Sequence, residues 1–185
     1  MKTLLLLRHG NAQQNAAQGD KARRLTEQGR QEAAEMGRKL PYIVGRLEAI
    51  VSSDAERALK TAQIVASRAG YAGEIRVEHD IYATDVDTML GVVRRLPDEY
   101  DRVLLVGHHP SLEYLAADIA EEGTPAQSLP TCGLLHLALE ASRWRDIRPG
   151  TGRLLGVYGP DDGRWTMDDG RWTMDDGRWT MDDGR

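Results

Sequence analysis

The sequence contains a single cysteine, no surplus of basic residues and no long apolar run, and each of these absences excludes a class of protein. One cysteine cannot form a disulfide bond within the chain, which excludes a small secreted scaffold stabilised by disulfides. The formal net charge of −5 argues against a nucleic-acid-binding protein that works by bulk charge. The longest early apolar run, Leu4–Leu7, is too short for a signal peptide or a membrane span. We therefore expect a cytoplasmic protein that binds neither nucleic acid nor membranes.

The composition that is present fits one folded domain with an unusual C-terminal extension. Of the 185 residues, 41% are apolar and 29% charged, which is typical of a globular protein with a sizeable core. The heptapeptide DDGRWTM begins at Asp161 and recurs from Asp168 and Asp175. Its Asp and Gly residues oppose a helix, and Arg-Trp-Thr-Met segments between Asp-Gly turns are long enough only for marginal strands. We expect one domain over residues 1–160 and a repeat tail, residues 161–185, outside its core.

Hydrophobic patterning over the first 160 residues predicts alternating strands and helices. Residues 3–7 form a continuous apolar run, as expected for a strand buried on both faces. Thr26 is the expected N-cap of a helix that ends at Leu40, before Pro41. Further helices are predicted at 54–68, 85–96 and 111–121, and further strands at 47–51, 75–77, 103–106, 134–139 and 154–157. This alternation predicts an α/β fold, a three-layer sandwich with a mostly parallel central sheet.

Three polar segments follow predicted strands directly, where ligands bind in sheets of this kind. They are Arg8-His9-Gly10, Ser52–Arg57 and Gly107-His108. Arginine binds phosphate oxygens bidentately and keeps its charge, while neutral histidine is a nucleophile near pH 7. Phosphoryl transfer needs an in-line nucleophile and fixed positive charge on the phosphoryl oxygens, which these side chains supply without a metal.

Four motifs in this order resemble those of the histidine phosphatase superfamily, which has the phosphoglycerate-mutase-like fold. They are Arg8-His9-Gly10, Leu25-Thr26 with Gly29, Ser52-Ser53-x-x-x-Arg57-Ala58 with Thr61-Ala62, and Gly107-His108-x-Pro110. The resemblance covers residues 1 to about 158. Within the superfamily, the run Arg23-Arg24-Leu25-Thr26 resembles the Arg-x-Leu-Thr segment of the short SixA-type phosphohistidine phosphatases.

The resemblance implies a role for each motif residue. His9 is then the nucleophile that becomes phosphorylated, Arg8 and Arg57 bind the phosphoryl oxygens, and His108 is the second histidine of the pocket. Arg23 matches a basic residue near the pocket, although Arg24 stands where those proteins often have proline, so either arginine can be the one that points inward. The resemblance implies no cofactor and no metal.

Other residues of the reactive types carry weaker signals. His109 replaces the asparagine common after the second histidine, and its role stays open. A metal site that includes His109 is disfavoured, because the sequence has no HxxxH or HExxH spacing. His79 and His136 belong to no motif, and Cys132 beside Gly133 is expected to be a packing residue.

A general acid for the leaving group is not evident in the sequence. Larger members of the superfamily use a glutamate in the loop after the third strand, and here Glu78, Asp80 and Asp85 are all candidates without a clean match. An alkoxide leaving group needs protonation, whereas phosphohistidine can expel a neutral imidazole once its ring is protonated. The sequence also contains no insertion long enough to serve as a lid over a small metabolite.

These observations favour a metal-independent phosphatase with a phosphohistidine intermediate that acts on protein phosphohistidine. A small-molecule phosphomonoesterase of the same fold is the enzymatic alternative, so the partner is a phosphorylated protein or a small phosphorylated substrate. The non-enzymatic alternative is a phosphate- or partner-binding domain with the acidic tryptophan repeats as its contact surface. The presence of all four residues Arg8, His9, Arg57 and His108 argues against it.

Overall fold

Six strands form one mixed sheet in the computed structural model, which describes residues 1–161 and the strand backbones at 165–168 and 171–174. The strands are β1 (Lys2–Arg8), β2 (Ala49–Ser53), β3 (Ile75–Glu78), β4 (Arg102–Gly107), β5 (Leu134–Leu139) and β6 (Gly152–Tyr158), in the spatial order β3-β2-β4-β1-β5-β6. The first four run parallel, and β5 is antiparallel to both of its neighbours. The predicted mostly parallel sheet is confirmed.

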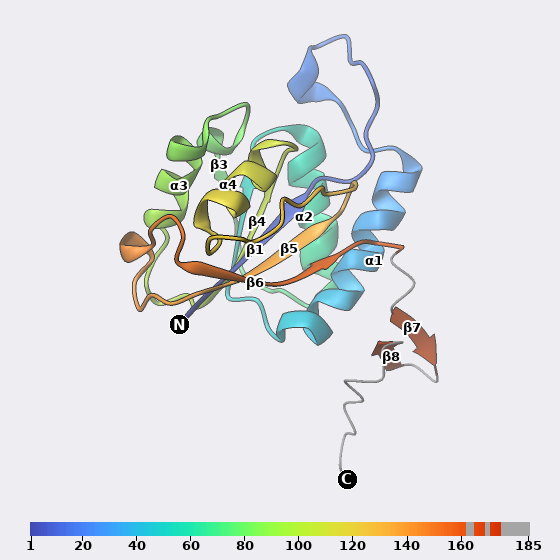
Figure 1. The fold of residues 1–185 in the computed structure, drawn as a ribbon. Coiled ribbons are helices and arrows are strands. Elements are labelled where there is room, and N and C mark those ends of the chain that lie inside the picture. The colour runs from blue at the N-terminus through green and yellow to red at the C-terminus, as the bar shows by residue number, and fades with distance from the viewer. Residues whose placement is uncertain (162–164, 169–170, 175–185) are drawn as a thin grey trace.

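Helices cover both faces of this sheet (Figure 1). One face carries α1 (Glu27–Val44) and α2 (Glu56–Arg68), and the other carries α3 (Val86–Arg94) and α4 (Ser111–Ile119). The central strand β1 shows how the sequence builds both cores, because successive side chains of a strand point to opposite faces. Leu5 and Leu7 pack in the core under α1 and α2, Leu4 and Leu6 pack in the core under α3 and α4, and all four are fully buried. The three-layer α/β architecture is thereby confirmed.

The predicted helix starts agree with the structure, and one predicted helix end is wrong. The Thr26 side chain accepts a hydrogen bond from the Gly29 amide at 3.1 Å, which confirms Thr26 as the N-cap of α1. We expected α1 to stop before Pro41, but it continues to Val44. A proline removes only its own N–H donor, and the last turn still closes because the Gly45 amide donates to the Pro41 carbonyl at 2.9 Å.

The connection between β1 and α1 is the part of the fold that extends farthest beyond the carboxyl ends of the parallel strands (Figure 1). It contains the short 3-10 helix η1 (Asp20–Ala22). A second 3-10 helix, η2 (His79–Ile81), follows β3 at the same edge of the sheet, and a third, η3 (Trp144–Asp146), lies between β5 and β6. The segments η1 and η2 both contribute to the site described below.

The repeat tail contributes a separate small sheet. β7 (Trp165–Asp168) and β8 (Arg171–Met174) pair antiparallel as a two-stranded sheet distinct from the six-stranded one. Residues 162–164, 169–170 and 175–185 of the predicted tail lie outside the described residues. The division of the chain at residue 160 stays a prediction. Among the helices of the described part of the chain, none is both long and apolar enough to cross a membrane.

Candidate active site

The three polar segments predicted to share one edge of the sheet do lie together. Their strands are neighbours in the order β2-β4-β1, and the His9 amide donates to the Gly107 carbonyl at 3.0 Å. The rings of His9 and His108 are 5.2 Å apart between centroids. Arg57, from the first turn of α2, places Nε 3.2 Å from Nε2 of His9. Two histidines and a buried arginine therefore form one cluster at the carboxyl end of the sheet.

Two motif glycines allow the end of β1 to approach the start of α1. A Cβ atom at Gly10 would lie 2.6 Å from the Gly29 carbonyl oxygen, and a Cβ atom at Gly29 would lie 2.0 Å from the Asn11 carbonyl oxygen. Neither position can accept a side chain without a backbone shift. The Gly10 amide also donates to the Thr61 hydroxyl at 3.1 Å, which ties the same turn to α2. These contacts explain why glycine and threonine occur in the motifs around His9.

His9 has the geometry and the protonation state of a nucleophile. Its Nδ1 lies 2.7 Å from the carbonyl oxygen of Gly10, so Nδ1 carries the proton and Nε2 presents its lone pair to the cluster. Burial first, and then the charges of nearby Arg57, Arg8 and Arg23, lower the pKa of His9 to about 4, although the hydrogen bond to the Gly10 carbonyl opposes them. The ring is therefore neutral at pH 7, the form that can attack a phosphorus atom.

His108 is held next to this nucleophile by β2 and η2. Its Nε2 lies 2.9 Å from the Ser53 hydroxyl, and the Tyr82 ring packs against it edge-on with centroids 5.4 Å apart. Burial lowers the pKa of His108 to about 3, with smaller contributions from the neighbouring His9 and Arg57. A dianionic phosphoryl group beside the ring would favour its protonated form. His108 can thus become a cationic hydrogen-bond donor when an anion binds.

Arg57 and Arg8 differ in whether all of their N–H groups have hydrogen-bond partners. The Arg57 side chain is only 6% exposed, and its Nη2 donates to the Asp20 carboxylate at 2.9 Å. Arg8 donates from Nη1 to the Leu129 carbonyl at 2.6 Å, while its buried Nε has no hydrogen-bond partner among the described residues. A buried donor without a partner is costly, and an anion bound beside Arg8 would satisfy it.

The choice between Arg23 and Arg24 is resolved by their exposure. The Arg23 side chain is 25% exposed and contributes to lowering the pKa of His9, so it lies close to the cluster. The Arg24 side chain is 69% exposed and forms an ion pair with Glu56 at 2.8 Å. Arg23 is the arginine that points towards the site.

Asp20 is a residue of the site that sequence reasoning missed. Its carboxylate accepts hydrogen bonds from Tyr82 Oη at 2.6 Å, from Arg23 at 2.9 Å and from Arg57 at 2.9 Å. These three donors hold the pKa of Asp20 well below its usual range. The Asp20 carboxylate thus accepts hydrogen bonds from Arg57 and Arg23, two of the arginines that the resemblance places at the phosphoryl group. The η1 segment contacts Arg57 through Asp20, and the expected lack of a lid-sized insertion stays a prediction.

The three candidate general acids all have partners elsewhere. Glu78 pairs with Arg76, and Asp80 pairs with Arg95 at 3.0 Å. Asp85 caps α3 by accepting a hydrogen bond from the Thr88 amide at 2.7 Å. The structure therefore brings none of these three carboxylates into hydrogen-bond contact with His9, His108 or Arg57.

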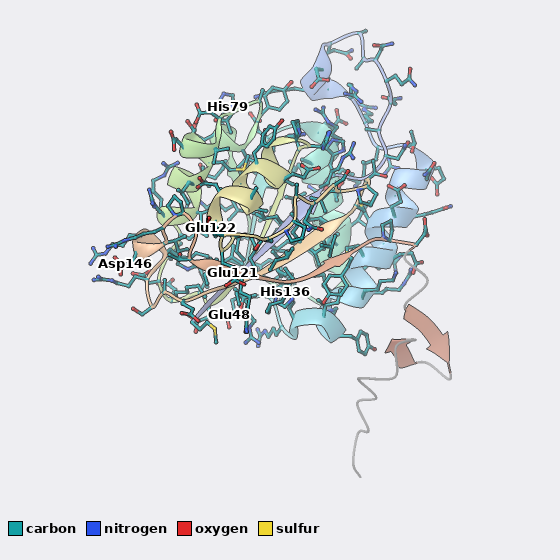
Figure 2. The ribbon with its side chains drawn as sticks, in the orientation of Figure 1. Glu48, His79, Glu121, Glu122, His136 and Asp146 are labelled. Atoms are coloured by element: carbon teal, nitrogen blue, oxygen red, sulfur yellow. The ribbon has the colours of Figure 1, made fainter. Side chains whose placement is uncertain are left out.

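The remaining reactive side chains lie apart from the cluster. His79 pairs with Asp54 near η1, whereas His136 lies on β5 opposite Leu5, in the middle of the sheet and not at its carboxyl edge (Figure 2). His109 points to Glu113 on α4. Cys132 is fully buried, and burial raises the pKa of its thiol, which fits the predicted packing role. Among residues whose side chains are described, no three His, Cys, Asp or Glu are grouped so as to hold a metal ion.

The lowered histidine pKa values predict a loss of stability in mild acid. The pKa of an unfolded histidine is about 6.5, and folding lowers the pKa of His9 to about 4 and that of His108 to about 3. Below pH 6.5 the unfolded chain therefore binds more protons than the folded chain, and the free energy of unfolding falls as the pH falls. Urea denaturation at pH 7.5 and 4.5 should show a decrease on the order of 2 kcal/mol per histidine.

The control for this pH prediction is His108→Gln, which removes one of the histidines whose pKa folding lowers. Its loss of stability between pH 7.5 and 4.5 should be smaller than that of the wild type. Equal losses in the two proteins would contradict the assignment of a buried neutral His108.

Four parallel strands have two neutral histidines and nearby arginines at their carboxyl edge, an arrangement suited to binding a phosphoryl group, and comparisons with known proteins point to the same class. Residues 4–87 match the sequence model of the histidine phosphatase superfamily, branch 1. An uncharacterized protein of Mycobacterium tuberculosis is 28% identical over 162 residues, which are 83% of this chain and 99% of that protein. The resemblance to the histidine phosphatase superfamily predicted from the motifs is thereby confirmed.

Solved structures of this superfamily share the fold. The protein histidine phosphatase SixA complexed with tungstate superposes with a TM-score of 0.75 at 24% identity, over 85% of this chain and 97% of that one. A putative phosphohistidine phosphatase SixA from Agrobacterium tumefaciens has a TM-score of 0.69 at 27% identity, over 86% of this chain and 98% of that one. Mycobacterial glucosyl-3-phosphoglycerate phosphatase has a TM-score of 0.64 at 20% identity, over 83% of this chain and 97% of that one. The histidine phosphatase fold thus serves phosphatases with different substrates, and phosphatase activity is the function that the comparisons support.

Proposed function

We propose that the protein is a metal-independent phosphatase that forms a phosphohistidine intermediate on His9 and acts on protein phosphohistidine. The observation that carries the proposal is the state of His9. Its ring is buried and neutral, and its Nδ1–H donates a hydrogen bond to the Gly10 carbonyl. Its Nε2 lies against the Arg57 guanidinium. Nε2 is therefore unprotonated, and its lone pair accepts the Arg57 Nε–H at 3.2 Å beside a fixed positive charge.

The first step transfers the phosphoryl group to the enzyme. The Nε2 lone pair of His9 forms a bond to phosphorus while the bond from phosphorus to the leaving group breaks and its electron pair goes to that group. Arg57, Arg8 and Arg23 donate hydrogen bonds to the phosphoryl oxygens and neutralise charge that spreads over them in the transition state. His108, protonated when the anion binds, adds a fourth donor.

The second step regenerates the enzyme. A water molecule attacks the phosphorus atom from the side opposite to His9, and the bond between phosphorus and Nε2 breaks. The electron pair returns to Nε2, so the ring leaves neutral and inorganic phosphate is the product. The hydrogen bond from Nδ1 to the Gly10 carbonyl keeps the ring in the same tautomer through both steps.

The proposed substrate class is supported by the carboxylates around the site. The three candidate acids are engaged elsewhere, and Asp20 is held ionised by its low pKa, so it cannot supply a proton near pH 7. A substrate whose leaving group is an imidazole that carries its own proton needs no enzyme acid. The likeness to two SixA structures supports the same class.

A small-molecule phosphomonoesterase is the second candidate. Two observations favour it: Asp20 of the η1 segment contacts Arg57, and the fold is shared with a glucosyl-3-phosphoglycerate phosphatase. A segment in contact with Arg57 would restrict the size of the group attached to phosphorus.

The two candidates are distinguished by comparing substrates. We expect kcat/KM for a phosphohistidine peptide to exceed that for a phosphoserine peptide and for a sugar phosphate at least about a hundredfold, about 3 kcal/mol in barrier. All reactions contain EDTA, because the proposed chemistry uses no metal. A preference for the sugar phosphate would favour the second candidate, and activity that requires an added divalent ion would overturn the mechanism.

We also propose that the repeat tail is not part of the catalytic unit. The site residues come from β1, η1, α2, η2 and the end of β4, all before residue 111. Each heptapeptide carries two Asp and one Arg, a net charge of −1, which repels a phosphorylated substrate. Deletion of residues 161–185 is expected to leave kcat/KM within about threefold, less than about 1 kcal/mol in barrier. A truncated protein that keeps the wild-type circular dichroism spectrum but loses most of its activity would contradict this.

A further inference from the structure

The segment between α4 and β5 supplies a backbone contact to the proposed phosphoryl-binding arginine Arg8. Residues 121–133 contain no helix or strand. Within them, the Leu129 carbonyl accepts the hydrogen bond from Arg8 Nη1 at 2.6 Å. This bond fixes one end of the guanidinium, so the direction of the free Nε donor depends on where Leu129 lies.

Leu129 is itself held by a buried acid on α4. Glu113 is 8% exposed in its side chain, and its Oε1 accepts a hydrogen bond from the Leu129 amide at 3.2 Å. The same oxygen accepts a hydrogen bond from His109 Nδ1. A carboxylate this deeply buried is costly unless donors of this kind compensate it. The two backbone groups of Leu129 are thus both engaged, the N–H by Glu113 and the carbonyl by Arg8.

We propose that Glu113 is a positioning residue for phosphoryl binding, acting on Arg8 through Leu129. By holding the Leu129 amide it keeps the adjacent carbonyl on Arg8 Nη1, which leaves the buried Nε of Arg8 aimed at the phosphoryl oxygens. The Leu129 side chain is anchored in the core, so loss of Glu113 removes the acceptor of the Leu129 amide, lets that peptide group rotate and allows the Arg8 guanidinium several orientations. The inference rests on the proposed function of Arg8.

The alternative is that Glu113 only stabilises the fold. A purely structural residue would change the melting temperature and leave the phosphate affinity of the folded protein unaltered. A positioning residue acts on phosphate affinity and does so only while Arg8 is present. A double-mutant cycle between Glu113 and Arg8 separates these possibilities.

The experiment measures the dissociation constant of inorganic phosphate by calorimetry, and kcat and KM, in Glu113→Ala, Arg8→Ala and the double variant. We expect Glu113→Ala to weaken phosphate binding about tenfold when Arg8 is present and less than about twofold in the Arg8→Ala protein. Glu113→Gln keeps an oxygen that accepts from the Leu129 amide, so its affinity should stay within about threefold of wild type. If Glu113→Ala does not fold, Glu113→Asp takes its place, because the shorter side chain keeps the charge and withdraws the acceptor.

The matched control is Ile119→Ala, in the last turn of the same helix. Ile119 is fully buried, lies next to Gly152 and has an apolar side chain that cannot hydrogen-bond to the Leu129 backbone, so its loss should lower the melting temperature and leave the phosphate affinity unchanged. If Arg8→Ala binds phosphate as tightly as wild type, the proposed role of Arg8 is wrong and the inference fails with it. If Arg8→Ala weakens phosphate binding but Glu113→Ala does not change it, only the inference about Glu113 is overturned. The same holds if Glu113→Ala weakens phosphate binding equally in the wild-type and Arg8→Ala proteins.

Discussion

Replacing His9 with alanine is expected to abolish both turnover and the formation of an acid-labile phosphoenzyme. The structure assigns the ring one tautomer and a neutral charge at pH 7, and no second group in the cluster can take its place. His108 is neutral too, but its Nε2 bonds to the Ser53 hydroxyl, whereas the Nε2 of His9 bonds to Arg57, which in the proposed mechanism donates to the phosphoryl oxygens instead. Losing the nucleophile should reduce kcat by at least about 10⁴-fold, more than 5 kcal/mol in barrier. Rapid acid quench with labelled substrate measures the intermediate, and steady-state assays measure turnover.

His136→Ala is the matched control for this variant. His136 is also a partly buried histidine of the sheet, but it lies on β5, away from the cluster (Figure 2). It should keep wild-type turnover and the wild-type yield of phosphoenzyme. The His9→Ala protein should melt cooperatively, because Ala needs no partner at a position where His9 bonds only to its neighbour Gly10 and to Arg57. Substantial phosphatase activity in folded His9→Ala would show that another residue is the nucleophile.

The fold was predictable because its signals are local and strong. The run Leu4–Leu7 is buried on both faces, and such a run can only be a central strand in a chain of this length. Thr26 caps the helix that it was expected to cap, and Asp85 caps the helix predicted to begin there, since a side chain that satisfies first-turn N–H groups is a short-range feature. The end of α1 was not predictable from Pro41, because the outcome depends on the hydrogen bonds of the residues that follow it.

The site was predictable where backbone topology alone brings residues together. His9, Arg57 and His108 follow or adjoin the ends of neighbouring parallel strands, so identifying the strands was enough to place them at one edge. Asp20 and Leu129 lie in segments without strands, and their contacts with Arg57 and Arg8 depend on how irregular backbone folds back over the sheet. Asp20 has only a weak signal in the sequence, an acidic residue three positions before Arg23.

The conservative replacement Arg57→Lys tests whether the shape of the guanidinium matters as well as its charge. Arg57 uses Nε towards His9, Nη1 towards the Asp20 carbonyl and Nη2 towards the Asp20 carboxylate, so three separate donors converge on the site. Lysine keeps the charge but offers one ammonium group, which cannot bind two phosphoryl oxygens in a fixed plane. The loss should be about 2–4 kcal/mol of transition-state stabilisation, or roughly 30- to 1000-fold in kcat/KM.

Arg8→Lys should lose activity in the same range, because it withdraws the free Nε donor, whereas Arg68→Lys should lose none. Arg68 is the last residue of α2 and is exposed, so it controls for an arginine-to-lysine change on the same helix as Arg57. A crystal structure with bound phosphate gives the direct check, since both the Arg8 and the Arg57 guanidinium groups should contact its oxygens. Wild-type kcat/KM in Arg57→Lys, or a phosphate bound away from both arginines, would show that positive charge alone is sufficient and that the planar donors do not orient the phosphoryl group.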